Sequence, residues 1–334
     1  MKQTEGQSAP IGLDIGTSRI VVARHVEKEF HFSSQLNAFV RIPFSKITED
    51  VLRKEQIPYT ADGSVLFVHG DASQRFADLL KSEISRPMDR GFLNPSEPDG
   101  LRLIREIVSS MTGKSDKHRK LYFTVPAAPA GAEENFTYHE AALRQELEGL
   151  GFEARSLNEG LAVVYSELEA SNFTGIGISC GGGLCNVCLS YLSVPITSFS
   201  LPKAGDFIDT SAASVTGERA NRIRILKEES LSLNNGHMKD KVQRVLSVYY
   251  DDMIRSLASA LKETFANVRG LPEFGKPIPL VLAGGTAMPK GFRDRFEAAL
   301  RETGFPIPLS EIRLASDPLS ATAKGALVAA LSEM

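Results

Sequence analysis

Four residues near the start of the chain combine a carboxylate, a glycine and two hydroxyls in one short turn. Asp14 lies at the end of an apolar segment, and Gly16, Thr17 and Ser18 follow it. A carboxylate at the rim of a turn can hold a hydrated Mg²⁺, while glycine-turn N–H groups and nearby hydroxyls can cradle a phosphate. The residue types and spacing therefore favour phosphate chemistry, although aspartate also caps many ordinary turns.

The same pattern returns 165 residues later in the chain. Residues 11–16 (IGLDIG) are echoed by residues 176–181 (IGISCG), and Gly181, Gly182 and Gly183 form the second turn. A third turn, Gly284-Gly285-Thr286, follows another apolar segment. Three glycine turns after apolar strands favour a polyphosphate ligand. The echo predicts a duplicated architecture whose first two turns face each other; the alternative is a coincidence between two ordinary hairpins.

Segments of helical and strand periodicity alternate around these turns. Apolar residues at helical spacing predict helices near 71–84, 97–111, 133–150 and 239–268, and short apolar runs predict strands at 121–125 and 279–283. Residues 38–44 are better explained by a core strand than by a membrane-touching loop. Alternation of strands and helices predicts an α/β class with a largely buried mixed sheet.

Composition excludes several classes of protein. The chain has 334 residues, enough for about two domains. It is 42% hydrophobic and 24% charged, and its net charge of −3 gives no broad positive field for nucleic acid. No apolar run approaches the length of a membrane span, and residues 1–10 are polar, so we expect a cytoplasmic protein. Three cysteines, Cys180, Cys185 and Cys188, lack a fourth partner for a metal cluster and predict buried thiols.

Five segments together resemble the superfamily of actin, the seventy-kilodalton heat-shock chaperones and the sugar kinases. Ile11–Ser18 resembles its first phosphate loop, Gly181–Gly183 its second, and Leu282–Pro289 its adenosine loop. Leu157–Ala162 is similar to its connecting helix start, and Ala204–Asp209 to its Gly-Gly-Asp-x-x-Asp step. Within the superfamily the chain looks most like the bacterial actins MreB and MamK, over roughly residues 10 to 330. Residues 70–72, 86–91, 317–320 and 324–325 carry that second likeness.

The resemblance implies an actin-like, ribonuclease-H-like duplicated fold of two lobes with a nucleotide cleft between them. The first lobe is expected at 8–157 with an inserted subdomain near 28–95. The second lobe is expected at 158–332, with an insertion near 207–270. A C-terminal helix near 317–332 is expected to pack back on the first lobe.

The resemblance also implies ATP with magnesium as the ligand and assigns roles to residues. Asp14 would hold a magnesium-bound water, and Glu159 would orient the attacking water. In the nucleoside-contacting helix the family's Glu-x-x-Lys pattern can be aligned in two ways, which use Glu218 and Arg222 or Asn221 and Arg224. The predicted nucleotide-binding residues are Gly16, Thr17, Ser18, Gly181, Gly182, Gly183, Gly205, Asp206, Glu218, Asn221, Arg222, Gly284, Gly285 and Thr286.

Three positions depart from the family pattern. Ser179 stands where relatives have an aspartate at the start of the second phosphate loop, and Leu184 replaces the usual threonine after the glycines. Gly160 replaces a proline, which predicts a looser helix start. A hydroxyl cannot anchor magnesium waters as a carboxylate does, so we expect nucleotide binding with very slow hydrolysis.

The resulting prediction is a MreB-like, ATP-binding cytoskeletal or scaffold protein that polymerises with itself. The resemblance further implies membrane-associated or cell-shape partners and a place in the cytoplasm or peripherally at the inner membrane. Two alternatives stay open: a non-polymerising nucleotide-binding adaptor, favoured by Ser179 and Leu184, and a small-molecule kinase. The kinase would need an acceptor site with a base opposite the terminal phosphate.

Overall fold

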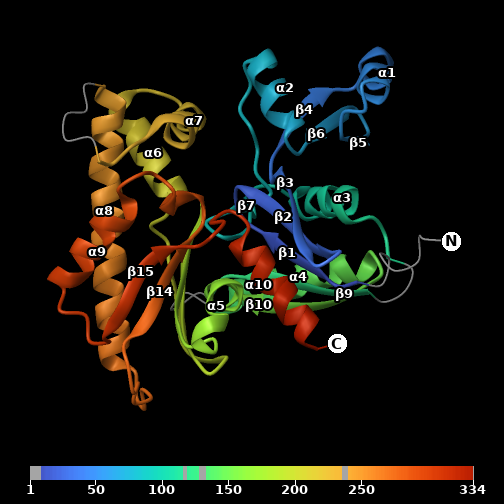
Figure 1. Cartoon of the computed structure of the whole chain (residues 1–334). Coiled ribbons are helices and arrows are strands. Elements are labelled where there is room, and N and C mark those ends of the chain that lie inside the picture. Colours follow the sequence, from blue (N-terminus) through green and yellow to red (C-terminus); the bar gives the residue numbers. More distant parts are fainter. Residues whose placement is uncertain (1–8, 116–118, 128–132, 235–239, 334) are drawn as a thin grey trace.

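The chain folds into two lobes, which the N-terminal and C-terminal halves of the sequence build in turn (Figure 1). The computed structural model describes residues 9–115, 119–127, 133–234 and 240–333. The polar stretch at residues 1–8 lies outside this description. Each lobe is centred on a five-stranded mixed sheet.

The first sheet has the strand order β10-β9-β1-β2-β3. Strand β1 runs antiparallel to β2, to which a tight turn joins it, and parallel to β9, which a long stretch of chain separates from it. The strands are β1 (Ile11–Ile15), β2 (Arg19–Val26), β3 (Glu29–Leu36), β9 (Arg119–Val125) and β10 (Phe152–Asn158).

The second sheet repeats this topology with the order β13-β12-β11-β14-β15. The middle strand is again antiparallel to its successor and parallel to a later strand. This sheet confirms the duplication that the sequence echo predicts. Its strands are β11 (Gly175–Cys180), β12 (Cys185–Tyr191), β13 (Val194–Leu201), β14 (Ile278–Ala283) and β15 (Leu309–Leu314).

Matching helices pack on the two sheets. In the first lobe α3 (Gly100–Thr112) and α4 (Glu133–Gly149) contribute apolar side chains to a core with β1, β9 and β10. In the second lobe α8 (Lys241–Asn267) and α9 (Phe292–Glu302) do the same with β11, β12 and β14. Leu257, Leu261 and Phe265 of α8 are completely buried. The helices and strands predicted from periodicity are therefore present, with ends shifted by a few residues.

Two further helices each pack on the sheet of the other lobe. Helix α5 (Glu159–Glu167) follows the last strand of the first sheet but packs on β11 and β12 of the second. Helix α10 (Ala321–Ser332) follows the last strand of the second sheet but packs on β1 and β9 of the first. In Figure 1 this last helix, drawn in red, lies beside β1 and β10 of the first lobe. The two helices also pack against each other and connect the lobes.

Glycines allow these helices to approach the sheets closely. A Cβ on Gly12 of β1 would overlap the carbonyl oxygen of Ala323 in α10, and a Cβ on Gly177 of β11 would overlap the carbonyl oxygen of Gly160 in α5. Gly160 itself lies against the backbone nitrogen of Cys188, and the side chain of Asn158 caps α5 by accepting from the Leu161 N–H at 3.1 Å. Gly160 therefore has a packing role, and the helix start that the sequence predicted to be loose is capped.

Smaller elements are inserted between these repeats. The first lobe carries a three-stranded sheet of order β4-β6-β5 with two helices, which Figure 1 shows at the outer end of that lobe, followed by a short β-ribbon. Phe39, Val40 and Ile42 are buried, which confirms the core strand predicted for residues 38–44. The inserted elements are β4 (Phe39–Pro43), α1 (Lys46–Lys54), β5 (Tyr59–Asp62), β6 (Val65–His69), α2 (Ala72–Leu80), β7 (Met88–Asp89) and β8 (Phe92–Leu93).

Two helices and two short 3₁₀ turns complete the described chain: α6 (Gly205–Thr216), α7 (Ala220–Ser230), η1 (Glu169–Ser171) and η2 (Gly285–Ala287). All three cysteines are buried, as predicted, with Cys185 in the α8 core and Cys188 against α5 on the other face of the sheet. Within the described ranges, we find no helix with the length and apolarity that crossing a bilayer requires.

Candidate functional site

A cavity of about 540 Å³ lies between the lobes, at the ends of β1, β11 and β14 where the three glycine turns occur. The position matches the general rule that ligands of α/β folds bind beyond strand ends. Twelve of the predicted site residues line it: Asp14, Gly16, Thr17, Ser18, Glu159, Gly181, Gly182, Gly183, Asp206, Gly284, Gly285 and Thr286.

The first two glycine turns face each other across this cavity, as the echo predicts. A Cβ on Gly182 would overlap the hydroxyl oxygen of Ser18, and a Cβ on Gly183 would lie 2.5 Å from the hydroxyl oxygen of Thr17. A side chain at 183 would also overlap the backbone nitrogen of Gly91, which cannot yield, whereas one at 182 would require the Ser18 hydroxyl to move. The glycines keep the two turns in close contact at the base of the cavity.

Two carbonyl groups of the second turn are occupied by hydrogen bonds within the protein. The oxygen of Gly181 accepts from the Gly205 N–H at 3.1 Å and from the Thr286 hydroxyl at 2.7 Å, and the oxygen of Gly182 accepts from the Asp206 N–H at 2.8 Å. The described part of the chain provides no acceptor for the N–H groups of Gly182 and Gly183. Such free, convergent amides form an anion-binding nest.

Two partly buried carboxylates stand beside the turns, each held by hydroxyl or amide donors. The two oxygens of Asp14 accept from the hydroxyls of Thr124 and Thr322, the latter at 2.7 Å. One oxygen of Glu159 accepts from the Ser179 hydroxyl at 3.1 Å and from the Asn186 amide at 2.9 Å.

The two halves of the fold repeat this strand-to-helix hydrogen bond, but the acid and the hydroxyl change places. In the first half the strand supplies the acid, Asp14 of β1, and helix α10 supplies the hydroxyl, Thr322. In the second half strand β11 supplies the hydroxyl, Ser179, and helix α5 supplies the acid, Glu159. The serine that departs from the family pattern is therefore a hydrogen-bond donor to the acid predicted to orient water.

Burial changes the acidity of both carboxyl groups. Burial raises the pKa of Asp14, although the hydrogen bonds from Thr124 and Thr322 oppose the change. Burial, and next the charge of Asp14, raise the pKa of Glu159 to about 8, against the hydrogen bonds from Ser179 and Asn186. Two carboxyl groups that resist ionisation together favour a cation between them.

This donor set fits magnesium held through water and phosphate oxygens. The described residues contain no group of three or more His, Cys, Asp or Glu side chains that could cage a metal ion. Asp14 and Glu159 provide two carboxylates, and Mg²⁺ in phosphate sites commonly uses one or two of these plus waters and phosphates. The residues thus fit a metal that arrives with a phosphate ligand.

A buried ion pair that lines the cavity beside the second turn was missed from the sequence. Lys227 of α7 bonds through Nζ to Asp209 at 2.8 Å and to the oxygen of Gly205 at 3.3 Å. The predicted residue Gly205 is not among the residues that line the cavity; a Cβ on it would lie 2.7 Å from the Thr286 hydroxyl oxygen and 3.2 Å from Nζ of Lys227. The second oxygen of Asp209 and the hydroxyl of Tyr250, both at the cavity, have no partner within the described residues. Neither of the two alignments of this helix with the family pattern extended beyond Arg224, so neither included Lys227.

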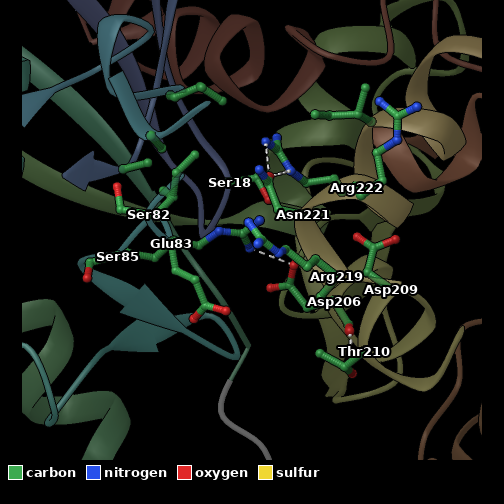
Figure 2. A pocket seen from close by; sticks show the side chains of 18 of the residues that line it. Ser18, Ser82, Glu83, Ser85, Asp206, Asp209, Thr210, Arg219, Asn221 and Arg222 are labelled. Carbon is green, nitrogen blue, oxygen red and sulfur yellow. Dashed lines mark hydrogen bonds and ion pairs between the residues drawn. The ribbon is translucent and has the colours of Figure 1, made fainter. Parts of the chain in front are cut away.

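Three predicted nucleoside contacts lie elsewhere. Glu218, Asn221 and Arg222 line a second, larger cavity of about 830 Å³ between the lobes, which Figure 2 shows with Asn221 and Arg222 labelled. The structure does not bring these three side chains to the cavity of the glycine turns. The ion pair of Arg86 with Asp206, at 2.6 Å, crosses from lobe to lobe where the two cavities adjoin.

Leu184 also differs in role from the threonine of relatives. It is buried, and a Cβ on Gly91 would overlap its side chain, so it packs beneath the segment that leads to β8. The backbone N–H of Gly91 donates to the hydroxyl of Thr17 at 3.0 Å. This segment therefore contacts both glycine turns.

Duplicated sheets, exchanged helices and an interlobe cavity with paired glycine turns define an actin-like protein. Solved structures with the same fold include one described as a MamK double helical filament, with 18% identity, 97% of this chain and 98% of that chain covered, and a TM-score of 0.72. MreB5 of Spiroplasma citri bound to ADP has 15% identity, coverage of 95% and 94%, and a TM-score of 0.62. The ethanolamine utilization protein EutJ from Carboxydothermus hydrogenoformans has 16% identity, coverage of 95% and 88%, and a TM-score of 0.57.

The sequence model of the Volactin family matches residues 10–330. The chain belongs to the Volactin family. No curated protein matches it significantly.

Proposed function

We propose that this protein is an ATP-binding cytoskeletal or scaffold protein of the actin type, which polymerises head to tail in the cytoplasm and hydrolyses ATP slowly. The observation that carries the proposal is the pair of facing glycine turns with free amides beside two partly buried carboxylates of raised pKa. The similarity to MamK and MreB5 supports it, because one is described as a filament and the other as bound to ADP.

In this proposal each group has a task set by its position. The free amides of Gly182 and Gly183, with the Ser18 hydroxyl, would bind phosphate oxygens. Asp14 would hold a water of the magnesium ion, and Glu159 would orient the attacking water. Magnesium, when bound, would neutralise phosphate charge and allow both carboxyl groups to ionise.

Polymerisation should depend on nucleotide. We expect the purified protein to sediment at high speed with Mg-ATP and to stay in solution without it. Asp14→Ala should remove the ATP-dependent pellet, because it deletes the carboxylate that holds the metal. Electron microscopy of the pellet should show strands, and a melting curve of the variant without nucleotide separates lost binding from lost fold. Wild-type protein that binds ATP but stays soluble at micromolar concentration would contradict the filament and support the adaptor alternative.

Hydrolysis should increase when the missing carboxylate is restored. We expect Ser179→Asp to raise magnesium-dependent ATP turnover at least about tenfold, since one well-placed acid or base contributes about 10²–10⁴ in rate. Ser179→Asn, of nearly the same size but uncharged, is the matched control and should stay at the wild-type rate. Phosphate release in steady state measures both variants. Equal rates for the two substitutions would show that Ser179 does not limit turnover.

A further inference from the structure

We propose that Asn37 is the positioning residue that orients the first glycine turn toward phosphate. The inference rests on the proposed nucleotide site. Asn37 directly follows β3, is fully buried, and does not line the cavity itself. Its role would therefore be exerted through the backbone of the turn, not through contact with a ligand.

Two hydrogen bonds connect this residue to the turn. The side-chain amide of Asn37 donates to the carbonyl oxygen of Gly16 at 2.9 Å, and its backbone N–H donates to the oxygen of Ser18 at 3.0 Å. The Gly16 N–H closes the hairpin on the oxygen of Arg19 at 2.9 Å. Both carbonyls are thereby turned away from the cavity. The N–H groups of Thr17 and Ser18 find no acceptor among the described residues and form the nest.

The oxygen of the same amide group has no hydrogen-bond partner. Oδ1 of Asn37 is buried and unpaired within the described residues. Rotating the amide by half a turn would place this oxygen against the oxygen of Gly16, so the turn fixes the amide orientation. An unpaired buried oxygen lowers stability, and its presence needs an explanation. Holding the turn for a ligand provides that explanation, because an apolar side chain would avoid the unpaired oxygen.

The second turn is held in a different way. The backbone at the start of α6 and the hydroxyl of Thr286 bind its carbonyl groups. In the first turn the backbone N–H of Asn37 holds the Ser18 carbonyl, and its side chain alone holds the Gly16 carbonyl. Replacing that side chain should consequently disturb the phosphate end of the site and leave the nucleoside end unchanged.

The test compares ATP with adenosine, which has no phosphate. We expect Asn37→Leu, which lacks both the donor and the unpaired oxygen, to weaken ATP binding about tenfold or more, as expected for losing one buried hydrogen bond that orders the site. Adenosine affinity should stay at the wild-type value, and the melting temperature should change little. Asn37→Asp keeps the shape but places an acceptor against Gly16, and should weaken ATP binding further. Titration calorimetry measures the affinity of each variant for each ligand, and a melting curve measures its stability.

Asn267→Leu is the matched control. Its amide also donates to a backbone carbonyl, that of Glu263 at 2.7 Å, but near the end of α8 and outside the cavity lining. Equal losses of ATP and adenosine affinity in Asn37→Leu, or unchanged ATP affinity, would overturn the positioning role. Wild-type protein that binds neither ligand would instead overturn the proposed function, and this inference with it.

Discussion

Replacing Gly325 with alanine is expected to lower the free energy of unfolding by about 3 kcal/mol or more, or to prevent folding. Gly325 lies in α10 where this helix crosses α5, and a Cβ there would overlap the carbonyl oxygen of Ala162. Both partners are backbone, so relief requires moving a helix that also packs on β1 and β9. Overpacking of a tight core typically costs about 1–3 kcal/mol and more where nothing can yield.

Gly275→Ala is the matched control for this substitution. A methyl group added at Gly275 would meet no atom within 4 Å, and the backbone there has no left-handed angle, so alanine should be neutral or slightly stabilising. Urea unfolding followed by circular dichroism compares the two variants with wild type. A Gly325→Ala protein as stable as the control would mean that the crossing of α5 and α10 is loose.

The duplicated frame could be predicted from the sequence because its signals are local. The echo of residues 11–16 in 176–181 lies within single hairpins, and the long apolar stripe of α8 has a clear helical period. The exchange of α5 and α10 between lobes left no such local signal; the packing of the C-terminal helix on the first lobe was expected only from the family resemblance. The exchange depends on contacts between residues more than 150 positions apart, such as Gly12 with Ala323 and Gly325 with Ala162. In the sequence these glycines look like helix breakers or turn residues.

The residues of the candidate site likewise fall into those that local motifs predict and those that only the fold brings to the cavity. Its glycine turns and Asp14 follow directly from short motifs, and the structure brings them together in one cavity. Thr124, Thr322 and Asn37 were missed, because each sits in an ordinary strand, helix or strand end and reaches the site only through the fold. The predicted nucleoside contacts lie on or just before α7, and the side chains of this segment divide between the two cavities. Asn221 lines the second cavity, Lys227 lines the cavity of the glycine turns, and Arg224, which one of the two alignments used, lines both.

The acid pair should make the ligand-free protein less stable as the pH rises from 6.5 to 8. The pKa of Glu159, about 8 when folded, lies above its ordinary value of 4.5, so in this range the folded protein keeps a proton that the unfolded chain releases. Stability is then lost up to pH 8, by about 2 kcal/mol at 1.36 kcal/mol per pH unit. The raised pKa of Asp14 acts in the same direction. Burial lowers the pKa of His69 and His139 to about 4, so these two histidines change the stability mainly below pH 6.5.

Glu159→Gln should abolish most of this slope, because glutamine cannot ionise in either state. Glu167→Gln is the control. Burial raises the pKa of Glu167, but hydrogen bonds from Arg313 and Ser316 outweigh burial and lower it below its ordinary value. The effect of Glu167 on the pH dependence of stability is therefore complete well below pH 6.5. Urea midpoints measured at each half pH unit give the slopes. A wild-type slope that survives in Glu159→Gln would place the titration in another group.

Saturating Mg-ATP should flatten the wild-type slope, because a cation beside Asp14 and Glu159 favours their ionised forms. That result would connect the titration of this acid pair to the ligand proposed for the cavity.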